Sequence, residues 1–355
     1  MFWIEKPFEP HIEEVKWSEE EEYDYHLKHG DKVILKHQQI FDENNEVIIP
    51  FSFKICQLKN NKTKLTFSAV HSISDGKSMF YLFDLIKKVI KGKSLEKIDE
   101  SLPSFSQREN FKNLDNSFSE TPKVWNEINK FSVFPKVEPP IQYITVYHTY
   151  DYITIKKFCK DNEISLQGML TAALTRAARK YKNLPKETPI WSGTPCDARI
   201  SPLATDEYKK KKLYNNAGGF YPCIIGQATL MEDFKHCTKQ IREAKNTEDY
   251  VRQIIACADV IDPKTLKFIP KGVFPDIHVH SVINASNIGY TNGSPLLYVT
   301  NITFSNNYNM IYHAYYNSKT LFIAGLMPVN LDEKFRNCIE EELENTFHQC
   351  LTTKN

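Results

Sequence analysis

Six consecutive residues in the first quarter of the chain combine side-chain types that could do chemistry. Residues 71–76 read His-Ser-Ile-Ser-Asp-Gly and follow the pattern HxxxDG. The imidazole of His71 titrates near neutrality, so it is suited to remove a proton from a hydroxyl or an amine. Asp75 is better suited to order the turn than to relay protons. The pattern therefore makes His71 a candidate general base.

Each residue of this motif also has a purely structural interpretation. A lone histidine is often a half-buried structural residue. Asp75 could be the N-cap of a following helix, and Gly76 could simply ease the turn. At the level of sequence these alternatives stay open.

The elements around the motif favour a turn between a strand and a helix. Apolar and β-branched runs predict strands at 33–35, 47–58 and 63–70, separated by Asn-rich turns. After the motif, apolar residues recur with a helical period over residues 77–90. A strand-to-helix turn can hold a side chain rigidly while it faces a cleft.

The rest of the chain predicts further strands and helices. The acidic stretch 13–24 predicts a solvated face or loop, and residues 91–122 predict a surface connection. Prolines between 135 and 140 mark the most plausible subdomain boundary, and Ser165 is a fair helix N-cap. The predicted strands are 141–150, 296–304, 309–316 and 320–325, and the predicted helices are 153–160, 165–181, 233–244 and 331–351.

Length, charge and cysteine pattern exclude several classes of protein. The 355 residues suit one large domain or two subdomains. Lysines and arginines number 45 against 44 acidic residues, which gives no global reason to bind nucleic acid or an anionic membrane. The eight cysteines lack zinc or disulfide spacing, and neither a Gly-rich nucleotide motif, a signal peptide nor a membrane-length apolar run is present. We therefore expect a cytoplasmic protein with no metal site.

The motif and several later segments resemble the CoA-dependent acyltransferase superfamily. This group includes chloramphenicol acetyltransferase, plant BAHD acyltransferases, fungal alcohol acetyltransferases, polyketide-associated mycobacterial acyltransferases and the condensation domains of peptide synthetases. HxxxDG between a strand and a helix looks like its signature. The further similar segments are an Ala-rich helix at 165–181, a P-x-D-x-R strand end at 193–199, a small-residue segment at 217–220, an SNxG element at 286–289 and a closing strand–strand–helix pattern at 312–350.

The resemblance implies an α/β fold of two chloramphenicol-acetyltransferase-like subdomains. Each would be a mixed β-sheet with flanking helices, and an active-site tunnel would lie between them. We place the N-terminal subdomain, which carries HxxxDG, at residues 1–138 and the C-terminal subdomain at residues 139–355.

The resemblance also implies roles for individual residues. His71 would be the general base, and Asp75 and Gly76 would support the site. An arginine would pair with Asp75; Arg199 is the first candidate and Arg176 the alternative. Ser286 or Asn287 could stabilise the oxyanion or contact the acceptor, with a simple turn as the alternative interpretation.

Three features depart from the family pattern. Members carry a longer segment before the motif than the 70 residues found here, so we expect the usual N-terminal strand and helix to be absent. Residue 70 is valine, where condensation domains carry a second histidine. The DFGWG motif of plant BAHD enzymes is missing near the C-terminus. The nearest patterns are those of alcohol acetyltransferase-like and condensation-like free-standing enzymes.

Two other groups of residues are weaker candidates. His278 and His280 lie on one face of a predicted strand and could bind a metal, but no third ligand has a telling spacing, so a core or tunnel-lining role is favoured. The run Lys209–Lys212 could meet the phosphates of CoA, although a solvated loop is the more common meaning of such a run.

We therefore expect a monomeric acyltransferase that moves an acyl group, in the first place acetyl, from CoA to a hydroxyl or amine of a small molecule. Acyl-CoA would be a co-substrate, and no permanently bound cofactor is expected. One alternative is a shortened, non-catalytic relative that binds a small molecule or a partner. Another is a condensation-type enzyme whose donor is a thioester on a carrier protein. The intact His71 and Asp75 favour catalysis, and the short N-terminal region favours the binding protein.

Overall fold

The computed structural model describes the two sheets, most helices and the segments that join them. The described residues are 12–17, 51–58, 63–69, 74–95, 107–114, 124, 127, 133, 135, 137, 143–213, 215–259, 282–293 and 310–352. His71, His278, His280 and the predicted strands 33–35 and 296–304 lie outside these ranges.

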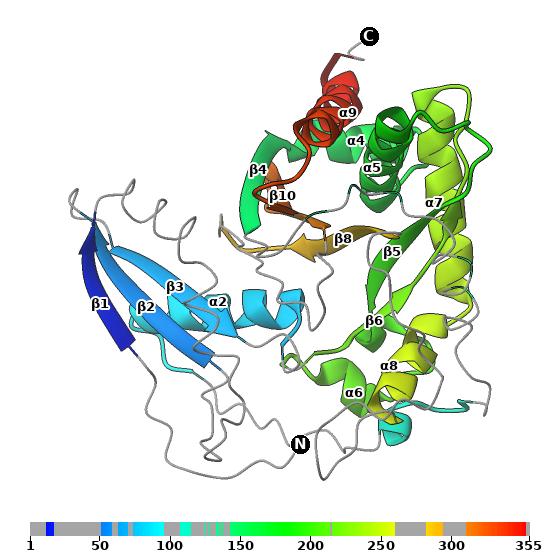
Figure 1. The fold of residues 1–355 in the computed structure, drawn as a ribbon. Coiled ribbons are helices and arrows are strands. Elements are labelled where there is room, and N and C mark those ends of the chain that lie inside the picture. Colours follow the sequence, from blue (N-terminus) through cyan, green and yellow to red (C-terminus); the bar gives the residue numbers. More distant parts are fainter. Residues whose placement is uncertain are drawn as a thin grey trace.

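A three-stranded sheet precedes the motif. It has the order β1-β2-β3 and consists of Ile12–Trp17, Phe51–Leu58 and Thr63–Ala69 (Figure 1). The β2–β3 pair is antiparallel and confirms the strands predicted in this region, whereas β1 and β2 are parallel. Residues 13–17 of the stretch predicted as a solvated face or loop belong to strand β1, so the loop alternative was wrong there, and the solvated face stays a prediction. Pairing with β2 gives the backbone of β1 partners along one edge, and such pairing can outweigh an acidic local composition.

A seven-stranded mixed sheet forms the larger part of the fold. Its strand order is β4-β10-β9-β8-β5-β6, and β7 also pairs with β5. The β8–β9 and β5–β8 pairs are parallel, and the β10 pairs are antiparallel. The strands are β4 (Tyr143–Asp151), β5 (Ile190–Asp197), β6 (Ala217–Phe220), β7 (Cys223–Ile224), β8 (Val282–Tyr290), β9 (Ile311–Tyr316) and β10 (Thr320–Pro328).

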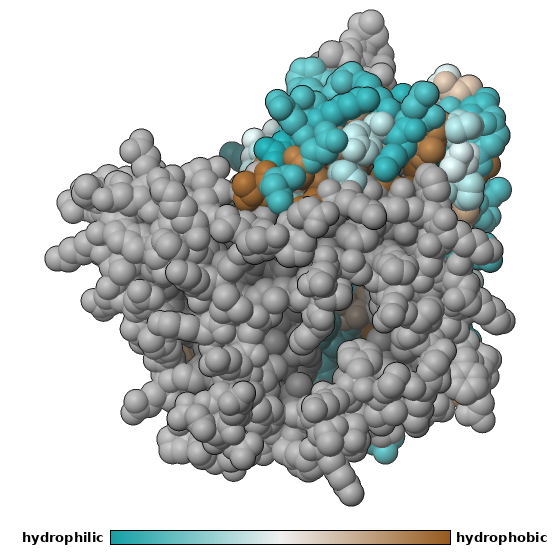
Figure 2. All heavy atoms as spheres, in the orientation of Figure 1, coloured by the Kyte–Doolittle hydropathy of each residue, from teal (hydrophilic) through white to brown (hydrophobic). Residues whose placement is uncertain are grey.

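One face of the large sheet is covered by a layer of helices. It consists of α4 (Tyr152–Asp161), α5 (Leu166–Lys182), α7 (Leu230–Asn246) and α9 (Glu333–Thr352) (Figure 1). The predicted N-cap is present, because the Ser165 side chain accepts a hydrogen bond from the backbone N–H of Gly168 at 3.0 Å. The outer side of this layer is largely hydrophilic, with apolar residues toward the sheet (Figure 2). None of the described helices combines the length and the apolar composition that a membrane-spanning segment needs.

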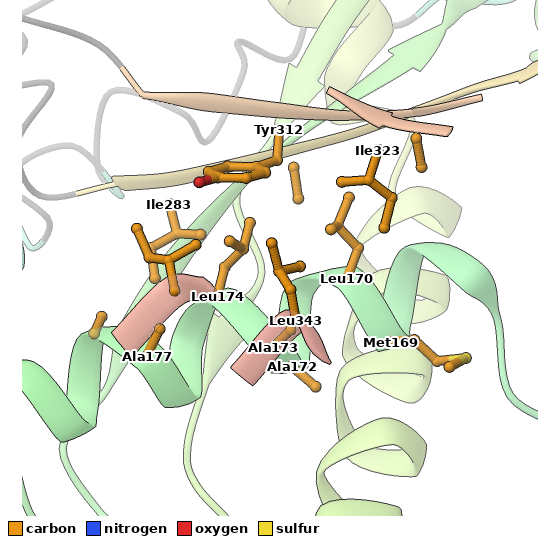
Figure 3. Packing of buried hydrophobic residues seen from close by; sticks show 14 of the residues in the cluster. Met169, Leu170, Ala172, Ala173, Leu174, Ala177, Ile283, Tyr312, Ile323 and Leu343 are labelled. Carbon is orange, nitrogen blue, oxygen red and sulfur yellow. The ribbon is translucent and has the colours of Figure 1, made fainter. Parts of the chain in front are cut away.

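The main hydrophobic core lies between this helical layer and the sheet. Leu170 and Leu174 of α5 and Leu343 of α9 point toward Ile283, Tyr312 and Ile323 of the strands (Figure 3). All six side chains are buried. At position 325 a β-carbon would collide with the ring of Tyr312, so the glycine lets this ring lie flat against β10. The Ala-rich helix predicted at 165–181 is therefore a core helix.

Helix α2 (Gly76–Ile90) lies on the opposite face of the large sheet. Phe80 packs in a small cluster with Ile288 of β8, Tyr315 of β9 and Phe322 of β10. Its ring centroid is 5.6 Å from that of Tyr315. Further along the helix, the side chain of Lys87 donates a hydrogen bond to the carbonyl of Asn292. Helix α2 therefore runs in the same direction as β8, and its N-terminus points back toward the start of that strand.

A second core lies beside β5 and β6. It includes Phe111, Tyr208, Phe220 and Tyr250. Phe111 follows η2 (Gln107–Asn110), and the other three side chains come from α6 (Asp206–Lys210), β6 and α8 (Asp249–Asp259); Ala198 of η3 (Ala198–Ile200) also belongs to this core. The strands of the large sheet all come from residues after 139, while the small sheet and α2 come from earlier residues. The boundary at residue 138 itself stays a prediction.

Candidate active site at the start of helix α2

Asp75 is the N-cap of α2, and its carboxylate is fully hydrogen-bonded. One oxygen, Oδ1, accepts hydrogen bonds from the backbone N–H and the hydroxyl of Ser78, at 2.8 and 2.9 Å. The other oxygen, Oδ2, accepts from Arg199 Nη2 at 2.9 Å and from the backbone N–H of Asn216 at 3.0 Å. A carboxylate offers about four acceptor positions, and all of them are used. Asp75 therefore anchors the start of α2 and has no acceptor position left for another group.

Of the two candidate arginines, Arg199 makes the ion pair with Asp75. Its side chain is 9% exposed, and that of Asp75 is 7% exposed. The pKa of Arg199 is raised above its ordinary value: burial alone would lower it, but the charges of Asp75 and Asp197 outweigh burial. Arg176 instead binds Asp233 and Glu342 in the helical layer.

Asp197 extends this network to the first turn of α2. Its Oδ1 accepts from the backbone N–H and from Nε of Arg199, at 3.0 and 2.7 Å, and its Oδ2 accepts from Nζ of Lys77 at 2.9 Å. Burial alone would raise the pKa of Asp197, but hydrogen bonds and charges from Arg199 and Lys77 hold it below the ordinary value. The network thus alternates two carboxylates with two cations.

Gly76 allows α2 to approach β8 closely. A β-carbon at position 76 would lie 2.8 Å from Cγ2 of Ile288, closer than real side chains pack. Its backbone φ is not in the left-handed region, so a special turn conformation does not explain the glycine. From the sequence, Gly76 could simply ease the turn. In the structure the glycine instead allows close contact between α2 and the sheet.

Ser286 and Asn287 lie on different faces of the large sheet. Ser286 is opposite His313 in the β8–β9 register, and Asn287 is opposite Ala314. Ala314 belongs to the main core, whereas Tyr315 packs against α2. His313 is two residues before Tyr315 and therefore lies on the same face of β9. Since strand residues alternate between faces, Ser286 shares the face of α2. No described residue accepts or donates a hydrogen bond at its hydroxyl.

His313 is a polar residue on this face that the sequence interpretation missed. His313 is 8% exposed. It lies two residues before Tyr315 on the same face of β9, and Tyr315 contacts Phe80 of α2, so His313 lies toward the N-terminal end of α2. Ser286 and His313 therefore lie side by side on the sheet, toward the N-terminal end of α2. Counting alternate positions along the predicted strand 309–316 could have placed His313 opposite the core face, but only the register with β8 brings it beside Ser286.

Cys196 and the lysine run 209–212 are further polar groups close to the start of α2. Burial raises the pKa of the Cys196 thiol to about 11, so a neutral thiol lies beside Asp197. Lys211, in the predicted phosphate-binding run, is 8% exposed, and Nζ of Lys212 lies 5.0 Å from the ring centroid of Tyr81 on α2. Phosphate binding by this run stays a prediction. Among the described residues no group of His, Cys, Asp and Glu side chains could hold a metal ion.

Solved structures share this fold. A trichothecene 15-O-acetyltransferase from Fusarium sporotrichioides superposes with a TM-score of 0.60 over 94% of this chain and 76% of its own, at 11% identity. The first condensation domain of the calcium-dependent antibiotic synthetase has a TM-score of 0.60 at 6% identity, over 97% and 76% of the two chains. Polyketide synthase associated protein 5 from Mycobacterium tuberculosis has a TM-score of 0.55 at 14% identity, over 87% and 79%.

Comparison of the sequence alone finds no significant match to a family model or to a curated protein. The structural matches show that the chain has the fold of the condensation domains and related CoA-dependent acyltransferases, with two pseudo-domains. The resemblance noted in the sequence is thereby confirmed at the level of the fold. The fold is of the acyltransferase type, and the donor, the acceptor and the catalytic base belong to the proposal that follows.

Proposed function

We propose that the protein is an acyltransferase that moves an acyl group, in the first place acetyl, from CoA to a hydroxyl or amine of a small molecule. The observation that carries the proposal is the anchoring of Asp75 by Arg199 and the backbone of Asn216. This anchor holds the end of the segment that begins with His71. A non-catalytic binding protein has no need of both an imidazole at this place and a buried ion pair behind it.

His71 is the general base in this proposal. It takes the proton from the hydroxyl or amine of the acceptor, whose oxygen or nitrogen forms a bond to the thioester carbonyl carbon. The carbon–sulfur bond then breaks, and the CoA sulfur leaves with the proton that His71 had taken. Asp75 takes no part in this proton transfer, since its acceptor positions are filled.

Ser286 is the proposed donor to the tetrahedral oxyanion. It lies on the face of α2, is 7% exposed, and its hydroxyl is not engaged by another described residue. A donor fixed on a strand is preorganised toward developing charge, which is the arrangement that stabilises such intermediates. Asn287, on the other face, is less well placed for this role and remains the second candidate.

The test is thiol release from acetyl-CoA in the presence of a panel of alcohols and amines. Wild type should release CoA in an acceptor-dependent way, and His71→Ala should lose at least about 100-fold in kcat. The matched control is His348→Ala, which removes an exposed histidine of α9 on the opposite side of the sheet; its turnover should equal that of wild type.

Two outcomes would replace the proposal. Acyl transfer from an acyl-pantetheine carrier protein but not from acetyl-CoA would identify a condensation-type enzyme. Equal background rates for wild type and His71→Ala with both donors, together with saturable binding of a small molecule, would identify a non-catalytic relative.

A further inference from the structure

The two carboxylates and Arg199 at the start of α2 are not balanced by themselves. Asp75 and Asp197 carry two negative charges, and Arg199 carries one positive charge. Lys77 supplies the fourth charge, with Nζ 2.9 Å from Asp197 Oδ2. Because the side chains of Asp75, Asp197 and Arg199 are at most 14% exposed, an unbalanced charge here would be poorly solvated.

Lys77 also occupies a place where a helix does not favour a cation. It is in the first turn of α2, where the macrodipole favours negative charge, and this turn contains no acidic residue. Lys87 and Lys88 of the same helix are in the last turn, where cations are favoured. The helix dipole therefore does not explain why a lysine occupies position 77, whereas the ion pair with Asp197 does.

The division of the Asp197 oxygens gives Lys77 a specific effect on Arg199. Arg199 binds Asp197 through Oδ1 alone, while Lys77 occupies Oδ2. A guanidinium prefers to bind both oxygens of one carboxylate. With Oδ2 occupied, Arg199 keeps Nη2 for Asp75. Nη1 of Arg199 donates to the backbone carbonyls of Lys211 and Lys212, both at 3.2 Å, and keeps the guanidinium in place. The effect expected on loss of Lys77 is therefore a shift of Nη2 from Asp75 toward the freed Oδ2 of Asp197.

We propose that Lys77 is a positioning residue, which holds Arg199 on Asp75 and thereby fixes the end of the motif that begins with His71. The proposal rests on the proposed function for its activity readout alone. Lys77 need not touch substrate. Its effect passes through Asp197, Arg199 and Asp75 to the end of the motif.

The test compares Lys77→Met with the conservative Lys77→Arg and with Lys88→Met, which removes an exposed lysine from the other end of the same helix. Lys77→Met should lower kcat for CoA release about tenfold, because small displacements of a catalytic group are costly. KM for acetyl-CoA should stay within about twofold, since no substrate contact is lost. Lys77→Arg should recover most of the activity, and Lys88→Met should equal wild type.

A second readout does not depend on turnover. The Hε1 resonance of His71, assigned as the signal missing from His71→Ala, should shift or broaden in Lys77→Met and stay in place in Lys77→Arg and Lys88→Met. The urea midpoint of Lys77→Met should fall only slightly and by less than the loss of activity, because Lys77 is half exposed and water can partly replace it beside Asp197.

Three results would overturn the proposal. They are an unchanged His71 resonance in Lys77→Met, the same losses in Lys77→Arg as in Lys77→Met, and a urea midpoint that falls in proportion to activity. If wild type fails to release CoA, the proposed function fails, and the His71 resonance still decides the role of Lys77.

Discussion

Two arginines of this molecule each pair with two acidic side chains, but the two clusters lie in different parts of the fold. Arg176 binds Asp233 and Glu342, and Arg199 binds Asp75 and Asp197. The first cluster joins three helices of one layer, while the second joins the start of α2 to the end of β5. Arg176 is also 34% exposed, against 9% for Arg199. The same chemistry thus strengthens a core in one place and positions a candidate catalytic turn in the other.

The largest effect should come from Arg199→Met. Removing the guanidinium leaves the buried Asp75 without a cation and Asp197 with Lys77 alone, which should lower the free energy of unfolding by about 3–5 kcal/mol. The remaining folded protein should lose at least about 100-fold in kcat, because the turn before α2 is released. Urea unfolding and CoA release measure the two effects. Arg242→Met, an exposed position on α7, is the control, and wild-type turnover in a folded Arg199→Met would contradict the comparison.

Arg176→Met should have a smaller effect of a different kind. Water reaches this guanidinium, so the loss of unfolding free energy should be about 1–3 kcal/mol. Turnover per folded molecule should not change, because the cluster lies on the side of the sheet away from α2. Activity normalised to the folded fraction, from the same urea curves, tests this. A fall in normalised kcat would show that the helical layer also positions the site.

The smallest effect concerns pH and Asp197. Its pKa in the folded protein lies below the ordinary value of 3.8, because Arg199 and Lys77 outweigh the opposing effect of burial. The unfolded chain therefore binds the proton first, and this stabilisation is present above about pH 4 and lost as pH falls through the folded value. The difference in unfolding free energy between wild type and Asp197→Asn should shrink from about pH 5 to about pH 3.

Urea unfolding across that pH range is the measurement. Asp161→Asn, which removes a half-exposed partner of Lys157 on α4, should show almost no such dependence. A gap between wild type and Asp197→Asn that stays constant with pH would show that the network does not depend on the ionised carboxylate.

Much of the fold could be predicted from local patterns. Helix α5 with its Ser165 cap, helix α2 and the strands β9 and β10 follow directly from periodicity and capping residues. Strand β1 could not, because its acidic composition is outweighed by pairing with a partner far along the chain. Helix α8 was also missed. Its apolar residues Tyr250 and Val251 are buried against the second core, which only the tertiary structure assembles.

The candidate site divides in the same way. The motif itself and the pairing of Asp75 with an arginine came from sequence and resemblance, and the structure selects Arg199 over Arg176. The contribution of Lys77 and the position of His313 could not be foreseen. Both depend on how α2 lies across β5, β8 and β9, and neither residue belongs to a sequence motif that would have marked it. His71 lies outside the described residues, so its role rests on the motif and on the anchor behind it.

The packing of α2 against late strands has a consequence during synthesis. Lys87 and Asn292 are 205 residues apart in the chain, which a ribosome takes roughly 10–40 s to cover. Throughout that interval Phe80 lacks the strand residues that bury it, and Asp75 must wait for Arg199 before its turn is anchored. A nascent chain therefore presents an unburied amphipathic helix that a chaperone could hold. A fragment that stops before β8 should have no finished site, so that the proposed acyl transfer would begin only once β8 and β9 have been made.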